Sequence, residues 1–504
     1  MATRYPTRLL EIDKPELNQV RLTEGRLLEV GSQYVTLSHC WGQSQVSKLT
    51  QQTKQRIEDG VPISELGKTF RDAIQVAREI GVPYIWIDSL CIIQDQLEDW
   101  LYEAPRMTDI YSGSLLNIAA TSGPDSESGL IPRRDLPPVT PFLFPLDEND
   151  PASEQYTLYD HKFTVNSFVN MPLITRAWVV QELLLAPRVL HFCGTQMFWE
   201  CAELSACETY PNGFPPGLDA HGIRQHTLWN IFHPGGSSRS KFRLLNKWKE
   251  IVDVYSRCSL TYQSDRLVAI SGIAKLFQRS LKADYYAGLW SDGLEYQLLW
   301  TGRTLERRYP PTSYIAPTWS WASMDGPVES RNARKQGDVR KTLITIKDCH
   351  IETRTSDDTV GILSGSLRLS GWLVTVVIVQ LRRIPEKPER GFDIFMNGVW
   401  AKSDNCRVYL DRKVTTDLVH ALPVISCTLP DHGTHRETYA DFLLLCPTGD
   451  ASGRFYRIGA MYAKLKDFGL QDDIPRHAFR GIKNEPWLNY ESCDATGLYT
   501  VVIV

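Results

Sequence analysis

Residues 81–93, GVPYIWIDSLCII, form the stretch that decides the fold of the N-terminal half of the chain. The run from Val82 to Ile87 is almost continuously apolar and rich in β-branched and aromatic side chains. Such a run is typical of a strand buried on both faces of a parallel sheet, so we predict a central strand here. It ends at Asp88 and Ser89. Polar groups at the carboxyl end of such a strand lie where open α/β sheets bind their ligands.

Helices are expected on both sides of this strand. Residues 66–80 place apolar side chains at helical spacing with charged ones between them, which indicates one amphipathic helix. Ser64 is the predicted N-cap and Gly81 the predicted stop of that helix. A second helical pattern runs through residues 99–111, and the proline within it limits its length.

The neighbouring segments repeat the alternation of strand and helix. Strands are predicted at 34–38 and within 114–121, and a helix from 177 to 186 is followed by a strand at 189–192. Residues 1–30 carry short apolar pieces that predict an extended arm or a small hairpin. The alternation predicts an α/β fold with a parallel sheet.

The length of 504 residues exceeds one ordinary hydrophobic core. We expect an N-terminal α/β domain over 1–210, a helical middle region over 211–312 and a β-rich C-terminal domain over 313–504. A proline-rich insert near 123–170 interrupts the first domain and is interpreted as a structural flap, with a lid over the crevice as the alternative. The run SYIAPTWSWAS at 313–323 is the first of several strand-like segments in the last domain.

Composition excludes several classes of function. The net charge of -4 gives no reason to expect nucleic acid or an anionic membrane as partner, and no stretch approaches the roughly 18 uninterrupted apolar residues of a membrane span. The first residues lack the apolar core of a secretory signal, so a cytoplasmic location is expected. The 11 cysteines show no paired spacing, and His432 and His435 have no cysteine near them, so no metal site is predicted.

Three residues carry candidate chemistry of their own. His39 and Cys40 are a candidate base and nucleophile, but adjacent strand residues point to opposite faces and cannot pair directly. A buried thiol beside a strand-end histidine is the alternative. Glu182 lies in an otherwise apolar helix, one turn beyond Trp178, and charged residues in such segments are usually paired. Arg176 or Arg188 is therefore its simplest predicted partner.

Three stretches together resemble the signature blocks of the fungal heterokaryon incompatibility (HET) domain family. They are YVTLSHCWG at 34–42, the block from Gly81 through WIDSLCIIQDQLEDWLYEAPRMTDIYSGS to NIAA at 117–120, and RAWVVQELLLAPRVLHFC at 176–193. Further motifs up to about residue 326 are similar to the remainder of standalone proteins of that family; they are FWEC at 198–201, SDRLVAISGIA at 264–274, YYAGLW at 285–290 and YIAPTWSWAS at 314–323. The chain departs from the family pattern at His39, where a tyrosine is often found, and at Ala177-Trp178-Val179, where the family often reads Gly-Trp-Thr.

The resemblance has implications for fold and site. HET domains are similar to TIR domains, which have a flavodoxin-like parallel sheet, and in active TIR enzymes a glutamate in a Trp-Cys-x-x-Glu-Leu helix cleaves NAD. The matching segment here is Trp178-Val-Val-Gln-Glu182-Leu183, so the resemblance makes Glu182 the candidate catalytic residue. The other expected site residues are Asp88, His39 and Cys40 for catalysis and Trp41, Ser89, Cys91 and Trp178 for substrate binding.

Three functions stay open at this stage. The first is incompatibility or programmed cell-death signalling by NAD cleavage, with NAD as substrate and no other cofactor. The second is a non-enzymatic signalling module that self-associates through the surface of the 99–111 helix. The third is a biosynthetic lyase, cyclase or isomerase that binds another small molecule in the same crevice.

Overall fold

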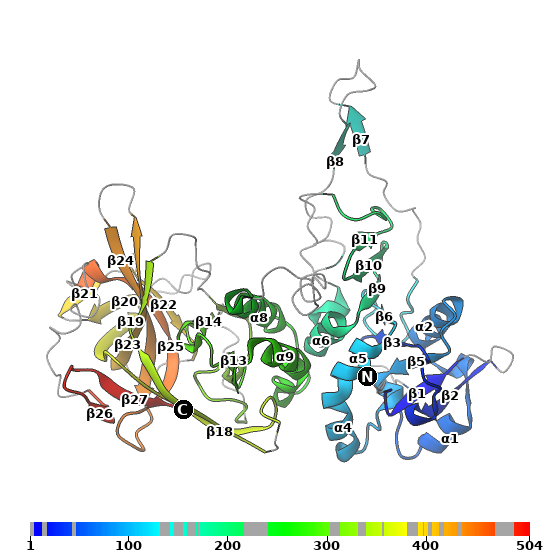
Figure 1. The fold of residues 1–504 in the computed structure, drawn as a ribbon, viewed down its shortest axis with the longest axis horizontal. Coiled ribbons are helices and arrows are strands. Elements are labelled where there is room, and N and C mark those ends of the chain that lie inside the picture. Colours follow the sequence, from blue (N-terminus) through cyan, green and yellow to red (C-terminus); the bar gives the residue numbers. More distant parts are fainter. Residues whose placement is uncertain are drawn as a thin grey trace. The chain divides into compact units, whose positions relative to one another are not determined.

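The computed structural model describes residues 5–12, 18–42, 47–131, 142–145, 155–158, 168, 171–215, 240–302, 313–330, 339–354, 357–380, 392–396, 398–401, 406–412, 418–430, 436–468 and 488–504. The chain forms two compact units (Figure 1). The first comprises residues 1–239, 258–260 and 269–276, and the second comprises residues 240–257, 261–268 and 277–504.

A nine-stranded sheet forms the centre of the first unit. Its strands, in spatial order, are β11 (Ser205–Cys207), β10 (Met197–Cys201), β9 (Arg188–Phe192), β6 (Leu116–Ala119), β3 (Tyr34–Ser38), β5 (Tyr84–Ile87), β1 (Arg8–Glu11), β2 (Gln19–Glu24) and β4 (Val61–Pro62). The four strands from β9 to β5 are mutually parallel, whereas every pairing outside them is antiparallel. The predicted parallel sheet is confirmed for the central strands, and the N-terminal hairpin is β1 with β2. A separate pair, β7 (Phe142–Pro145) and β8 (Gln155–Leu158), lies in the insert.

The order of the parallel strands indicates where a ligand crevice is expected. In chain order these strands are β3, β5, β6 and β9, so the spatial order β5-β3-β6-β9 reads 2-1-3-4. In doubly wound sheets of this order, the chain turns in opposite directions from the first strand, and the crevice opens at the carboxyl ends of strands one and three. Here those strands are β3 and β6, which end at Ser38 and Ala119. We therefore expect the functional site at the carboxyl end of β3.

Helices cover both faces of this sheet (Figure 1). They are α1 (Lys54–Asp59), α2 (Lys68–Glu79), α3 (Asp88–Cys91), α4 (Leu97–Glu103), α5 (Met107–Gly113) and α6 (Ala177–Leu185). On one face Phe70 of α2 packs edge-on against His39, with ring centroids 4.9 Å apart. On the other, Tyr111 of α5 packs against Trp86 of β5 at 5.6 Å. The site therefore lies between two helical layers.

The predicted start of α2 is wrong, whereas its end is confirmed. Ser64 falls in a 3-10 turn over Ile63–Glu65, and the N-cap is Gly67, because the chain makes that extra turn before the helix begins. Gly81 follows the last helical turn with φ of +72°, a conformation that glycine adopts without steric cost. The proposed lid, by contrast, falls largely outside the described residues.

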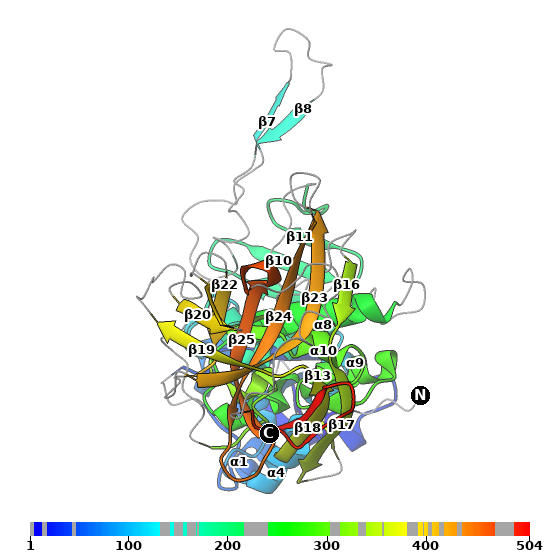
Figure 2. The ribbon, with the colours of Figure 1, turned by 90° about the vertical axis from the view of Figure 1, so that its left-hand side faces the viewer.

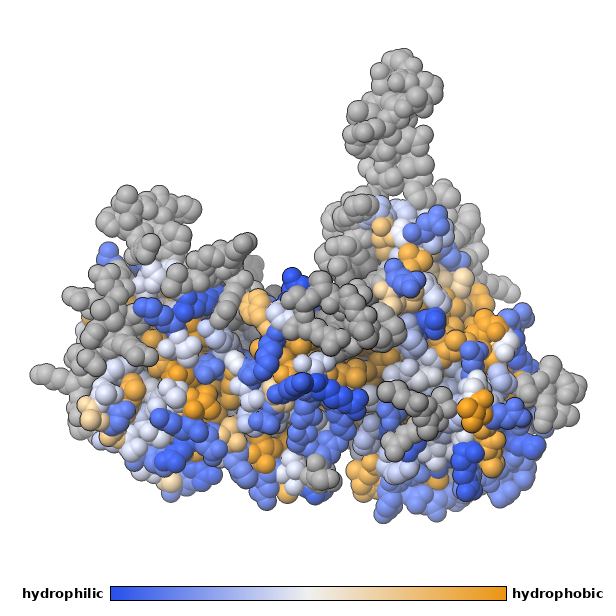
Figure 3. All heavy atoms as spheres, viewed as in Figure 1, coloured by the Kyte–Doolittle hydropathy of each residue, from blue (hydrophilic) through white to orange (hydrophobic). Residues whose placement is uncertain are grey.

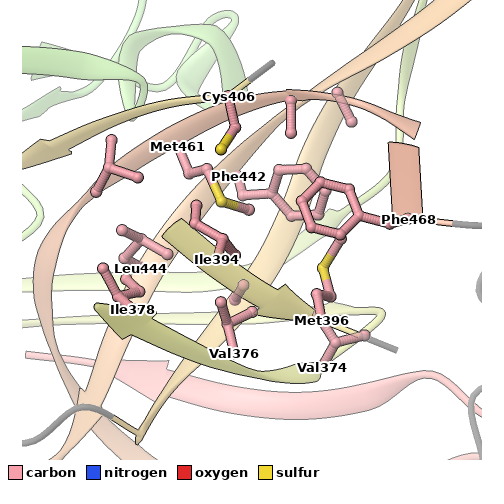
Figure 4. Packing of buried hydrophobic residues seen from close by; sticks show 14 of the residues in the cluster. Val374, Val376, Ile378, Ile394, Met396, Cys406, Phe442, Leu444, Met461 and Phe468 are labelled. Atoms are coloured by element: carbon pink, nitrogen blue, oxygen red, sulfur yellow. The ribbon is translucent and has the colours of Figure 1, made fainter. Parts of the chain in front are cut away.

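A twelve-stranded, largely antiparallel sheet dominates the second unit (Figure 2). Its main path is β17 (Thr345–Thr353), β18 (Ile362–Gly371), β27 (Tyr499–Ile503), β25 (Arg454–Lys464), β24 (Arg436–Pro447), β23 (Leu418–Pro430), β19 (Val374–Gln380), β20 (Phe392–Met396) and β21 (Val399–Ala401). Joined to this path are β16 (Val339–Thr342), β22 (Cys406–Leu410) and β26 (Ser492–Cys493). Figure 4 shows the packed core of this sheet, where Phe442, Met461 and Phe468 meet side chains from β19 and β20. The expected β-rich C-terminal region is confirmed.

The remaining elements of the second unit precede this sheet. They are the helices α8 (Lys241–Tyr255), α9 (Val268–Leu281, part of which belongs to the first unit) and α10 (Leu294–Gln297), and the strand pairs β12 (Tyr285–Tyr286) with β13 (Leu289–Trp290) and β14 (Trp300–Gly302) with β15 (Val328–Ser330). The strand expected over 313–323 is wrong. Ser320 accepts a hydrogen bond from the Ala322 N–H and caps a 3-10 turn over Trp321–Ser323, because capping serines favour a turn over an extended chain.

The molecular surface mixes apolar and polar residues, with hydrophobic spheres scattered among hydrophilic ones on the face in Figure 3. Among the described residues, no helix combines the length and the apolar character needed to cross a membrane.

One buried ion pair ties the large sheet to the strands before it. The Arg457 side chain is fully buried, and its Nε lies 2.9 Å from Asp411 Oδ2, which is also buried. The guanidinium donates to the backbone oxygens of Leu298 and Trp300 and lies 3.5 Å from the centre of the Trp300 ring. Removing one partner of such a pair leaves a buried charge without compensation.

We expect Arg457→Met to lower the free energy of unfolding by about 3–5 kcal/mol, because Asp411 loses its countercharge. Arg454→Met is the matched control on the same strand, since Arg454 forms an exposed pair with Asp450 at 3.2 Å. The control should lose less than about 1 kcal/mol. Denaturant unfolding followed by tryptophan fluorescence measures both, and equal losses would contradict a buried, uncompensated Asp411.

Candidate functional site

The Glu182 carboxyl lies at the carboxyl end of β3. Its Oε2 accepts a hydrogen bond of 2.5 Å from the hydroxyl of Ser38, the last residue of that strand. Ser38 in turn accepts from the amide of Asn117 on β6 at 3.0 Å, and the Asn117 oxygen accepts from Thr36 at 3.1 Å. Tyr111 of α5 also hydrogen-bonds to Glu182. One buried network therefore joins β3, β6, α5 and α6 at the predicted crevice.

Burial dominates the electrostatics of Glu182. The residue is 4% exposed, and desolvation raises the pKa of its carboxyl to about 7. The positive charge of Arg176 and the hydrogen bonds from Ser38 and Tyr111 oppose the rise, whereas the negative charge of Asp88 adds to it. A carboxyl group with a pKa near neutrality can act in either protonation state at physiological pH.

Three other predicted site residues, Trp41, Ser89 and His39, lie next to the Asp88 carboxylate. It follows β5, its Oδ2 accepts a 2.9 Å hydrogen bond from the Trp41 indole, and its Oδ1 accepts from the Ser89 N–H at 2.7 Å. Its Oδ1 also lies 3.7 Å from His39 Nδ1. Trp41, Ser89 and His39 therefore surround the Asp88 carboxylate, which orients the Trp41 ring. The Lys48 ammonium lies over that ring, 5.2 Å from its centroid.

His39 is a neutral, buried imidazole. Desolvation lowers its pKa to about 4, although the nearby Asp88 works in the opposite direction. Its Nε2 is buried and has no hydrogen-bond partner within the described ranges. A neutral ring with one nitrogen unoccupied can accept or donate a proton if a substrate reaches it.

The two predicted site cysteines are buried thiols. Cys40 packs in an apolar cluster with Leu173, Val179 and Leu183, and burial raises the pKa of its thiol. It therefore does not pair with His39, which contacts the α2 side of the sheet. Burial likewise raises the pKa of Cys91 to about 12. Thiols with raised pKa values are poor nucleophiles at neutral pH.

Trp178 and Glu182 lie on α6, and the first turn of this helix is hydrogen-bonded to Ser259, which is far along the chain. Trp178 is half-buried and meets Trp100 of α4 edge-on, with centroids 6.3 Å apart. The Ala177 N–H donates to the Ser259 oxygen at 3.1 Å, and the Ser259 N–H donates to the Thr175 oxygen at 2.7 Å. The first of these bonds satisfies an N–H group that a helix leaves without a partner at its start.

Metal binding finds no support in the described part of the chain, where no three His, Cys, Asp or Glu side chains cluster to hold an ion. His432 and His435 lie outside the described residues.

Sequence reasoning missed the partners of Glu182. Its predicted arginine partner is only partly right, because Arg176 contributes charge but donates its hydrogen bond to the His39 backbone oxygen. Ser38 and Asn117 carried a weak signal, since each is a polar residue in an otherwise apolar strand. Tyr111 carried none, because a tyrosine on a helix facing a sheet is usually a core residue.

Comparison with known proteins gives one family match. Residues 34–182 match the family model of the heterokaryon incompatibility protein (HET), a segment that begins with β3 and ends at Glu182. Comparisons with curated proteins and with solved structures give no significant match.

We expect Glu182→Gln to become more stable relative to wild type as the pH rises from 5 to 8. The unfolded carboxyl loses its proton near 4.5 and the folded one near 7, so wild-type stability falls through this window. Glutamine does not titrate, and the relative gain should reach at most about 3 kcal/mol. Glu98→Gln, at an exposed site on α4, is the matched control. Chemical denaturation at the two pH values measures the difference, and parallel behaviour of both variants would refute the burial argument.

Proposed function

We propose that this chain, which carries a heterokaryon incompatibility (HET) domain over residues 34–182, signals in incompatibility by cleaving NAD at the bond between nicotinamide and ribose. The observation that carries the proposal is the Glu182 carboxyl, buried at the switch point of a 2-1-3-4 sheet with a pKa near 7. The sheet order is that of flavodoxin-like folds, among which TIR domains are counted, and this supports the TIR-like interpretation.

Cleavage of the bond between nicotinamide and ribose requires few protein side chains. When the carbon–nitrogen bond breaks, nicotinamide leaves with the bonding electron pair and becomes neutral, and the ribose carbon becomes an oxocarbenium-like cation. An ionised Glu182 would stabilise that cation and accept a hydrogen bond from a ribose hydroxyl, as carboxylates do in glycoside hydrolysis. Water then adds to the cation and releases a proton. No general acid is needed, because the leaving group departs from a pyridinium.

The groups around Glu182 fit the remaining parts of such a substrate. Trp41 is oriented by Asp88, and Trp178 lies one helical turn before Glu182, so either ring can stack on nicotinamide or adenine. Access to Glu182 requires Ser38 or Tyr111 to exchange its hydrogen bond for one to the ribose. These two hydroxyls are therefore proposed as positioning residues.

We expect purified full-length protein at high concentration to release nicotinamide from NAD, and Glu182→Gln to reduce the rate by about 100-fold or more, because the stabilising charge is lost. The wild-type rate should rise between pH 6 and pH 8 as Glu182 ionises.

The matched control for this experiment is Glu200→Gln, which removes a buried carboxylate next to His191, away from the site. Its rate should equal that of wild type. Absence of release from folded wild-type protein, or equal loss in both variants, would overturn the assignment to Glu182.

A second candidate function, signalling by self-association without catalysis, is favoured by one surface. Helix α4 exposes Leu97, Leu101 and Tyr102 by 66%, 56% and 57% of their surfaces. Leu97 and Leu101 lie one turn apart on the same side of the helix. Clustered apolar exposure of this kind marks protein contact sites more often than single exposed residues do.

If α4 mediates self-association, Leu101→Glu should leave the protein monomeric at concentrations where wild type forms larger species, because a charge is buried at the contact. Val30→Glu is the control, since Val30 is 93% exposed in the same unit and outside this helix. Light scattering after size-exclusion chromatography distinguishes the variants. A monomeric wild type at all concentrations would rule this function out.

A further inference from the structure

The second unit contains a pocket of about 320 Å³ that is separate from the HET domain residues. Its walls include Phe242, Leu245 and Trp248 of α8, together with Tyr296, Trp300 and Trp321. The volume lies in the range of small-molecule sites, and these six residues include five aromatic side chains. This pocket brings together two motifs that the proposed function does not use, YYAGLW at 285–290 and YIAPTWSWAS at 314–323.

A glycine holds the aromatic wall in place. The Gly288 backbone oxygen accepts hydrogen bonds of 2.9 Å from the indoles of both Trp248 and Trp321. Gly288 has φ of +101°, and a Cβ at this position would lie 2.6 Å from the Trp321 indole nitrogen, so only glycine fits. Because both indole N–H groups are committed to this oxygen, the two rings offer hydrocarbon surface to the pocket.

The third tryptophan is fixed in the same way. The Trp300 indole donates to the Trp319 backbone oxygen at 2.9 Å, and the Arg457 guanidinium lies 3.5 Å from its ring centre. Trp248, Trp300 and Trp321 are each at most 3% exposed. A rigid set of aromatic walls favours a flat, apolar ligand, since little side-chain entropy is lost on binding.

Polar groups in the wall are mostly occupied by partners within the protein. Lys241 pairs with Asp292, and the Gln297 amide bonds to the backbone of Trp290 and Asp292. Asn246 and Lys249 are different, because within the described part of the chain no hydrogen bond or ion pair engages either side chain. They lie three residues apart on α8 and therefore on one side of the helix.

The charge of Lys249 is the feature that selects a ligand. Desolvation lowers the pKa of its ammonium, and the charge of Arg340 adds to this effect, while the carboxylates of Asp253, Glu329 and Glu250 raise the pKa. None of these four residues lines the pocket. A half-buried ammonium without a hydrogen-bonded partner gains from an anion that enters the pocket. The neighbouring Asn246 amide can donate to the same anion.

We propose that this pocket binds a small planar aromatic carboxylate, with its ring between the tryptophans and its carboxylate on Lys249 and Asn246. The proposal is independent of NAD cleavage, since none of its residues belongs to the Glu182 site.

Binding of 1-naphthoate to the full-length protein, measured by isothermal titration calorimetry, tests the proposal, with uncharged 1-naphthamide as the matched probe. Wild type is expected to bind naphthoate at one site per chain and about tenfold more tightly than naphthamide, because the charge-assisted hydrogen bond is made only with the anion. Lys249→Met should remove this preference and leave naphthamide binding unchanged. Arg243→Gln, an exposed change on the same helix, should alter neither affinity.

A second variant locates the site. Leu245→Trp fills the pocket from α8 and should abolish binding of both probes, while an unchanged circular dichroism spectrum shows that the variant folds. The proposal is overturned if wild type binds neither probe, if both bind equally, or if Leu245→Trp binds as wild type does.

Discussion

The burial of one carboxyl group at the end of β3 is the constraint on which the first unit depends. Glu182 is surrounded by apolar helix residues, and an isolated carboxylate in such a place would be strongly destabilising. The hydroxyls of Ser38 and Tyr111 make its burial tolerable, and Asn117 orients Ser38. These contacts come from two strands and two helices, so the relative register of all four elements is fixed by a single polar group. Such a satisfied network specifies one arrangement more strongly than apolar packing does.

The two carboxylates of the site occupy different environments, and this separates their roles. Asp88 has a partly exposed side chain, and its oxygens accept hydrogen bonds from the Trp41 indole and the Ser89 backbone N–H. Glu182 is almost inaccessible and carries a proton for part of the time near neutral pH. Pairs of acidic groups whose surroundings differ in this way are a common basis for division of labour in enzymes. Asp88 thus orients the Trp41 ring, whereas Glu182 is the carboxyl group that we propose for the reaction.

Local patterns in the sequence were sufficient for the elements of the site but not for their contacts. The strand at 34–38 was predicted from its alternating side chains, and the helix beginning at Ala177 was predicted from its apolar run before Pro187. The hydrogen bonds between Ser38 and Asn117 were not predictable, because the pairing of β3 with β6 depends on residues about 80 positions apart. The turn at Trp321 was missed for another reason: its signal is the local cap at Ser320, which the strand-like composition of 313–323 concealed.

The bonds between Ser259 and the first turn of α6 have a consequence for how the protein is made. The segment that matches the HET family ends at Glu182, yet the helix that carries this residue is fastened by a residue much later in the chain. A ribosome adds roughly 5–20 residues per second, so Ser259 is synthesised roughly 4–15 seconds after Glu182. During that interval the nascent chain has the whole family segment but not the contact that closes its last helix. The bond between Ser259 and the first turn of α6 can therefore form only well after the residues of the site have been translated.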